Sequence, residues 1–196
     1  PGTEPPRLTR ANTLERDGFR ETLLCLYSHT GTHMDAPAHM LEEGATLDAL
    51  PVDRFLGPAL VVDVSDLRGA SVTVQRLEPH REALGRTAFL LLHTGWDRYW
   101  GQKAYFGPFP CLTPEAAAWL EPFSLNGVGA DSISFDPMDS REFPVHHALL
   151  GRGLVLVENL TGLDRLPREG ALFGAFPLRY VGADGAPVRA VGMRLP

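Results

Sequence analysis

Residues 29–39 read His29-Thr30-Gly31-Thr32-His33-Met34-Asp35-Ala36-Pro37-Ala38-His39. This stretch holds three of the seven histidines in the chain, together with one aspartate. Imidazole nitrogen and carboxylate oxygen suit Zn²⁺, Mn²⁺ or Fe²⁺ better than Ca²⁺ or Mg²⁺, which favour shells of oxygen alone. None of these four polar side chains is a good core group, so packing alone does not explain why they cluster. The stretch therefore predicts a transition-metal site.

The local pattern predicts a strand that runs into a looped turn. The four-residue spacing of His29 and His33 would suit one face of a helix. Gly31, the two threonines and Pro37 nevertheless disfavour helix. In a strand, His33 and Asp35 instead point to the same side at a period of two residues.

Size and composition indicate one soluble globular domain. A chain of 196 residues with 44% hydrophobic and 21% charged residues can bury one substantial core. No apolar run approaches the roughly 18 residues of a membrane helix, and no signal peptide is visible. A net charge of −6 gives no basic face for nucleic acid or an anionic membrane. Two cysteines without a Cys-x-x-Cys unit are expected as reduced thiols in a cytoplasmic protein.

Hydrophobic patterning predicts an alternation of strands and helices. Strands are expected at 59–64, 89–93, 126–131, 153–158, 172–180 and 188–195, with an apolar run at 23–27 that delivers His29. Helices are expected at 73–84 and 113–121, and a short one within 47–55 after Asp48 or Pro51. Residues 1–18 are expected as an irregular arm or edge segment. Strands separated by helices, with several short connections, predict an α/β fold with a mixed sheet. The aromatic residues in 96–109 are expected to be ordinary packing, with a cover over the site as the alternative.

The second half of the metal site must come from downstream residues, because residues 29–39 leave the coordination incomplete. The candidates are His146, His147 and Glu158. Glu158 ends an apolar strand, where a carboxylate is costly unless it is paired or bound to a cation. A strand-end carboxylate that faces solvent is the alternative.

The motif at 29–39 resembles the signature of the cyclase-like metal-dependent hydrolases, which include bacterial kynurenine formamidases and isatin hydrolases. It matches His-Thr-Gly-Thr-His-x-Asp-Ala-Pro-x-His at every fixed position. The resemblance covers nearly the whole chain and implies one α/β domain over 1–196, with a mixed, partly barrel-like sheet and peripheral helices (swivelling β/β/α). Pro1-Gly2 resembles the end of a family turn, so a strand with an aromatic residue would precede residue 1.

The resemblance also implies a ligand set. Glu158-Asn159-Leu160 is similar to the family's Glu-Gly-Leu, and the histidine twelve residues earlier is His146 rather than His147. The family pattern implies that His29, His33 and Asp35 hold one metal ion. Asp35 would bridge to a second ion completed by His146 and Glu158, and His39 would be the proton shuttle. One or two Zn or Mn ions per chain and a homo-oligomer, dimer or tetramer, are implied as well.

The expected function is hydrolysis of a non-peptide C–N amide bond in a small-molecule substrate by metal-activated water. An aryl formamide such as N-formylkynurenine, an intermediate of tryptophan catabolism, or a small cyclic amide is the expected substrate. Ser132, Ile133 and His93 depart from the formamidase-like pattern and leave the substrate open. A ring-forming or ring-opening cyclase with the same cage, and a non-catalytic metal-binding protein, are the alternatives. Serine or cysteine catalysis and dinucleotide binding lack their motifs.

Overall fold

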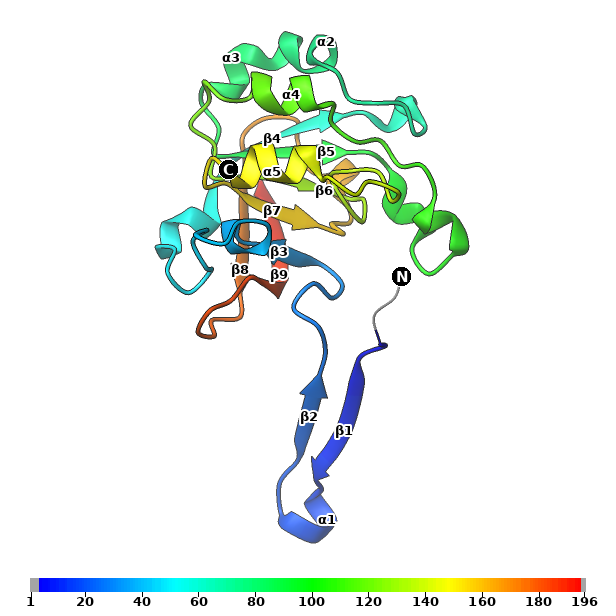
Figure 1. The fold of residues 1–196 in the computed structure, drawn as a ribbon. Helices are drawn as coiled ribbons and strands as arrows, with labels where there is room; N and C mark the ends of the chain where they lie inside the picture. The colour runs from blue at the N-terminus through cyan, green and yellow to red at the C-terminus, as the bar shows by residue number, and fades with distance from the viewer. Residues whose placement is uncertain (1–3, 195–196) are drawn as a thin grey trace.

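The computed structural model describes residues 4–194 and centres on a closed barrel of strand order β3-β7-β6-β5-β4-β8-β9 (Figure 1). Strands β4 to β7 run parallel, whereas β3, β8 and β9 pair antiparallel with their neighbours. The bounds are β3 His33–Asp35, β4 Leu56–Asp63, β5 Phe89–His93, β6 Gly127–Ala130, β7 Val155–Glu158, β8 Ala171–Pro177 and β9 Gly185–Arg194. The predicted α/β fold with a mixed, barrel-like sheet is confirmed.

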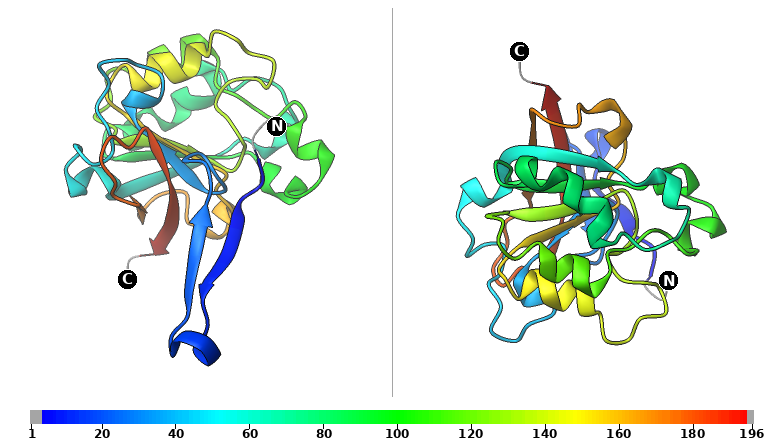
Figure 2. Two further views of the ribbon diagram at one scale, coloured as in Figure 1. Left: turned by 60° about the horizontal axis from the view of Figure 1, so that its bottom comes forward. Right: turned by 90° about the horizontal axis from the view of Figure 1, so that it is seen from above.

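Short helices cover the outer side of the parallel strands (Figures 1 and 2). They are α2 Val74–Leu77, α3 Arg81–Leu84, α4 Pro114–Trp119 and α5 Pro144–Leu150. The 3₁₀ helices are η1 Pro37–His39, η2 Val52–Phe55, η3 Ser65–Leu67, η4 Glu78–His80, η5 Trp96–Tyr99, η6 Lys103–Phe106 and η7 Leu163–Arg165. Within residues 4–194, none of the helices combines the length and apolar character that crossing a bilayer requires.

The parallel strands are buried on both faces, and this explains their continuous apolar sequences. Along β4, Leu60 and Val62 pack into the core between the sheet and the helices. Ala59 and Val61 alternate with them and face the second core, inside the barrel. The barrel interior also holds Phe89, so the barrel encloses a packed core rather than a channel.

One predicted helix is wrong in extent. Residues 73–84 form α2, η4 and α3 in succession rather than one helix, because Pro79 lacks the N–H that a continuous helix needs. The short helix expected within 47–55 is present as η2, which begins directly after Pro51. The helix predicted from Thr113 is present as α4, and the Thr113 hydroxyl accepts a hydrogen bond from the Ala116 N–H at 3.1 Å. Helix α5 was not among the predicted helices.

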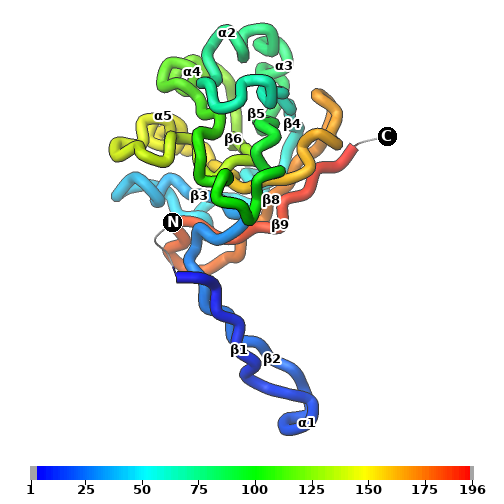
Figure 3. The backbone as a smooth tube through the Cα atoms, turned by 90° about the vertical axis from the view of Figure 1, so that its right-hand side faces the viewer, coloured from blue at the N-terminus to red at the C-terminus, as the bar shows by residue number. Residues whose placement is uncertain are grey.

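The apolar run at 23–27 is not a core strand. Its first residues belong to β2 (Glu21–Cys25), which pairs with β1 (Arg7–Asn12) in a hairpin arm, with α1 (Leu14–Asp17) at the tip. The arm projects away from the barrel (Figures 1 and 3). Residues 7–17 thus belong to an arm, as predicted, but they form regular secondary structure, and His29 is delivered by a loop. The expectation for Pro1-Gly2 lies outside the described residues.

The barrel core is tested by Phe89→Ala. Phe89 is fully buried, and its ring meets Phe173 edge to face at a centroid distance of 5.1 Å. Its truncation should lower the free energy of unfolding by about 3–5 kcal/mol, because it leaves a cavity that the barrel cannot close. Urea unfolding measures the loss. Phe106→Ala, which removes a ring that is 47% exposed, is the control, and an equal loss in both variants would contradict the packing described here.

Candidate metal centre

Strand pairing builds the centre of the site. The antiparallel register places His33 of β3 directly opposite Glu158 of β7. Asp35 lies two residues along β3, so it points to the same side as His33. The exposed fractions of Asp35 and Glu158 are 1% and 6%, which excludes a strand-end Glu158 that faces solvent. The sheet thus brings two buried carboxylates and an imidazole together.

The electrostatics of these carboxylates call for a cation. Burial and the neighbouring Asp35 charge raise the pKa of Glu158. Burial also opposes ionisation of Asp35, but hydrogen bonds from His29 and His33 outweigh it and hold the pKa of Asp35 far below its usual range. A buried carboxylate is costly unless a positive charge or a metal ion compensates it.

Each of three histidines is held by one ring nitrogen and turns the other toward these carboxylates. Gly31 oxygen lies 2.8 Å from Nδ1 of His33, and Asp136 Oδ2 lies 2.6 Å from Nδ1 of His146. Asp184 Oδ2 lies 3.0 Å from Nε2 of His29. Metal-binding histidines donate their second N–H to such carbonyls and carboxylates, which fixes the ring orientation. We call Gly31 O, Asp136 and Asp184 the histidine supports.

The spacing of the inward atoms fits a small metal ion. His33 Nε2 lies 3.3 Å from Asp35 Oδ1 and 3.4 Å from Glu158 Oε2. His146 Nε2 lies 3.2 Å from Glu158 Oε1. Ligand atoms about 2.1 Å from a tetrahedral zinc ion are separated by about 3.4 Å. The donor chemistry and the spacing therefore both fit a divalent transition metal.

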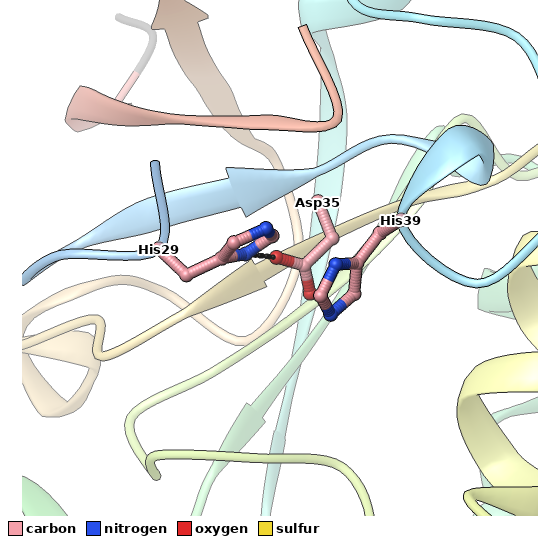
Figure 4. Close-up of side chains that lie close together, drawn as sticks. All are labelled: His29, Asp35 and His39. Carbon is pink, nitrogen blue, oxygen red and sulfur yellow. Dashed lines mark hydrogen bonds and ion pairs between the residues drawn. The ribbon is translucent and has the colours of Figure 1, made fainter. Parts of the chain in front are cut away.

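A second group of ligand-type atoms also includes Asp35 (Figure 4). His29 Nδ1 lies 2.7 Å from Asp35 Oδ1, and the His39 ring stacks on that of His29 at a centroid distance of 3.9 Å. Ligand atoms of His29, Asp35 and His39 lie within 4.8 Å of one another, as do those of His33, Asp35 and Glu158. Asp35 belongs to both groups, and His39 is near enough to be a ligand as well as a base.

Gly185 makes room for His29. Residue 185 pairs with Asp35 across β3 and β9, and a Cβ atom there would lie 2.5 Å from Cε1 of His29. No side chain fits in that space without moving the imidazole. The start of β9 therefore leaves space for the His29 ring, next to the support Asp184.

The metal centre opens into a cavity of about 1050 Å³. Its walls include the apolar side chains Met40, Trp100, Phe106, Ile133 and Phe143. The aromatic stretch 96–109 is divided, because Trp96 and Phe109 pack in a small core, Trp100 and Phe106 form cavity wall, and Tyr105 belongs to both.

The other histidines lie apart from the cavity. His93 Nδ1 lies 3.3 Å from Asp63 Oδ1, outside the cavity lining, and His147 is exposed on α5. Asp136 and Asp184 are the functional candidates that sequence reasoning missed. Asp136 precedes His146 by ten residues, and no local signal links Asp184 to the stretch 29–39, which lies 145 residues or more earlier in the chain.

Known proteins resemble this chain over most of its length. Residues 5–137 match the family model described as "Putative cyclase". The chain is 38% identical over 168 residues to a kynurenine formamidase of Salinibacter ruber (strain DSM 13855 / M31), an alignment that covers 86% of this chain and 77% of that protein.

Solved structures show the same fold. An isatin hydrolase bound to the product analogue thioisatinate superposes with a TM-score of 0.86 at 27% identity, covering 97% of this chain and 82% of that one. A potential metal-dependent hydrolase with cyclase activity gives a TM-score of 0.78 at 29% identity, covering 97% and 88%. These similarities confirm the predicted resemblance and the predicted class, a metal-dependent amide hydrolase.

The support of His146 is tested by Asp136→Asn. Asp136 accepts hydrogen bonds from the Val145 and His146 N–H groups as well as facing the His146 ring. Loss of its charge should weaken metal binding by about 10- to 100-fold. Competition with a chelating dye measures the affinity. Asp139→Asn, at an exposed position, is the control and should bind metal like the parent protein.

Metal affinity should increase with pH. Burial lowers the pKa of His33 and His146, but hydrogen bonds to Asp35 and Asp136, respectively, outweigh it and raise these values to about 9 and about 10 in the metal-free protein. An incoming ion must displace these protons, so the apparent Kd should fall as pH rises from about 6.5 to about 8.5. Calorimetry in two buffers of different ionisation enthalpy counts the protons released. Equal heats in both buffers would contradict this expectation.

Proposed function

Because this chain belongs to the cyclase family, we propose that it hydrolyses the C–N bond of an aryl formamide or a small cyclic amide. One relative is named a kynurenine formamidase and a solved neighbour an isatin hydrolase. A formamidase hydrolyses a formamide, and isatin contains a cyclic amide, so both names indicate a substrate with a non-peptide amide bond. N-formylkynurenine is the first substrate to test.

The observation that carries the proposal is the arrangement of supported histidines around two buried carboxylates. His29, His33 and His146 each hold one nitrogen on a support and turn the other inward. Together with Asp35 and Glu158 they would hold one or two zinc or manganese ions. The membership of Asp35 in both ligand groups supports a bridging role for it. An ion bound there supplies an activated water and polarises the substrate carbonyl.

His39 is the proposed proton shuttle. It lies on η1 after Pro37 and lines the cavity next to Asp35. Burial lowers the pKa of His39 below the ordinary value of 6.5, so the ring is neutral at pH 7. A neutral imidazole can accept the proton of the attacking water and return it to the departing nitrogen as the C–N bond breaks.

Turnover of a substrate panel tests this function. The zinc- or manganese-loaded protein should hydrolyse N-formylkynurenine, a simple formanilide or isatin, and open and closed forms of the ring substrates separate hydrolase from cyclase activity. His39→Ala should lower kcat by about 10²- to 10⁴-fold. The acid limb of the pH profile should lie below pH 6.5 in the parent protein, since the base must be neutral.

Metal content decides the role of His39. An unchanged number of ions per chain in His39→Ala supports the shuttle, whereas loss of an ion identifies His39 as a ligand. Full activity in His39→Ala would exclude both roles.

A homo-oligomer is part of the proposal, and the hairpin arm supports it. Leu8, Leu23 and Leu24 are 71%, 61% and 58% exposed in the arm. A lone two-stranded hairpin is at best marginally stable in water, so the arm needs a surface to pack on. Phe176 and Met193, on β8 and β9, are exposed apolar residues elsewhere on the same chain. A second copy, as dimer or tetramer, would cover both surfaces.

The setting we propose is cytoplasmic. Cys25 and Cys111 are free thiols, as expected in a reducing compartment. The acidic balance of the chain supports a small-molecule substrate rather than nucleic acid.

Light scattering after gel filtration tests the oligomer. The parent protein should have two or four times the mass of one chain, and Leu24→Glu should shift it toward monomer, because a charge cannot be buried cheaply in an apolar interface. Val52→Glu, also at an exposed position (70%), is the control. A monomeric parent protein would refute the oligomer and leave the hydrolase proposal intact.

A further inference from the structure

Asn159 occupies a position where the backbone favours glycine. It directly follows the candidate ligand Glu158, and its φ of 57° lies in the left-handed region. Its side chain is nevertheless buried, with 8% of the residue exposed. Asparagine tolerates this conformation better than most residues, but glycine adopts it at no steric cost. The side chain therefore needs an explanation other than the turn itself.

Both ends of the Asn159 amide are hydrogen-bonded. Its Nδ2 donates to the Gly31 carbonyl at 2.9 Å, and its Oδ1 accepts from the Tyr105 hydroxyl at 2.6 Å. A carbonyl can only accept, so the Nδ2 end must face Gly31 and the Oδ1 end is left for Tyr105. The orientation of the amide is thus fixed by its surroundings.

The two partners belong to different parts of the site. Gly31 O is the support of His33, and it accepts from His33 and Asn159 together. Tyr105 lies in η6, within the segment Trp100–Phe106 that forms the aromatic wall of the cavity. Tyr105 is 3% exposed, and its ring meets that of Trp100 at a centroid distance of 5.2 Å. One amide therefore joins the cavity wall to a ligand support.

We propose that Asn159 is a positioning residue that sets the distance between the aromatic wall and the metal centre, and so determines which aryl substrates fit. This inference rests on the proposed function for its substrate class. Without the Tyr105–Asn159 bond, the wall segment loses a buried polar tie to the β7 end of the barrel. A looser wall orients the aromatic part of a substrate less well while the reacting groups remain in place.

Tyr105→Phe and Asn159→Gly separate the two halves of this arrangement. Both leave the fold intact, because the first keeps the ring and the second suits the left-handed backbone. Each should raise KM for aryl formamides by about 2- to 10-fold, the effect of one lost hydrogen bond, with kcat within about twofold of the parent. Only Asn159→Gly should also weaken zinc binding, by about 2- to 10-fold. Only this substitution removes the hydrogen bond to the Gly31 carbonyl, which supports His33.

The double variant and a second readout make the test decisive. Tyr105→Phe combined with Asn159→Gly should raise KM no more than Asn159→Gly alone, whereas additive effects would overturn the inference. Acrylamide quenching of tryptophan emission in the metal-free protein should increase equally in both single variants, since Trp96 is buried and donates its indole N–H to the Tyr105 carbonyl. Tyr99→Phe, one residue before the wall segment and outside the cavity lining, should change neither KM nor quenching.

The readouts also separate this inference from the proposed function. If the parent protein hydrolyses no aryl amide, the proposed function fails, while quenching and zinc affinity still test the role of Asn159. Unchanged quenching and zinc affinity in Asn159→Gly would overturn the positioning role even in an active enzyme.

Discussion

The buried charge of two carboxylates determines which groups the rest of the site must supply. Carboxylate oxygens of Asp35 and Glu158 lie within 4.8 Å of each other at the junction of β3 and β7, where both side chains are buried. Like charges in such a place are tolerated only with positive charge around them. The three supported histidines supply part of it, and a divalent ion would supply the rest. The loops and turns around the site place these positive groups next to the buried carboxylates.

The barrel explains why the solution is precise. Apart from His29, which lies in the loop before β3, the candidate ligands come from a strand that both β7 and β9 hold, from the end of β7, and from α5, all of them packed on buried apolar layers. Ligands on such elements have little freedom to relax, so their geometry is set before an ion arrives. The cavity wall is different, since Trp100 and Phe106 lie on short helices and loops outside the barrel. The metal centre thus lies on rigid barrel elements, whereas the cavity wall that selects the substrate lies on less rigid segments.

Sequence reasoning succeeded where the information is local and failed where it is not. The spacing of His33 and Asp35, and a carboxylate at the end of the apolar strand at 153–158, could be predicted because strand periodicity determines them. The apolar run at 23–27 was misplaced because an exposed arm and a buried strand look alike in sequence. Pro79 gave a local signal that was overlooked. The support Asp184 could not be found, because only barrel closure brings it to His29.

The short strand β3 has a consequence for how the protein matures. Its three residues are the seam between the first and last parts of the barrel, since they pair with β7 on one side and with β9 on the other. Pairing of residue 35 with residues 156 and 185 spans most of the chain, and such distant closures form late and slowly. A nascent chain cannot assemble the centre until its final hairpin has been made. Metal acquisition would then mark the end of folding, and an ion across the seam would lock the ring shut.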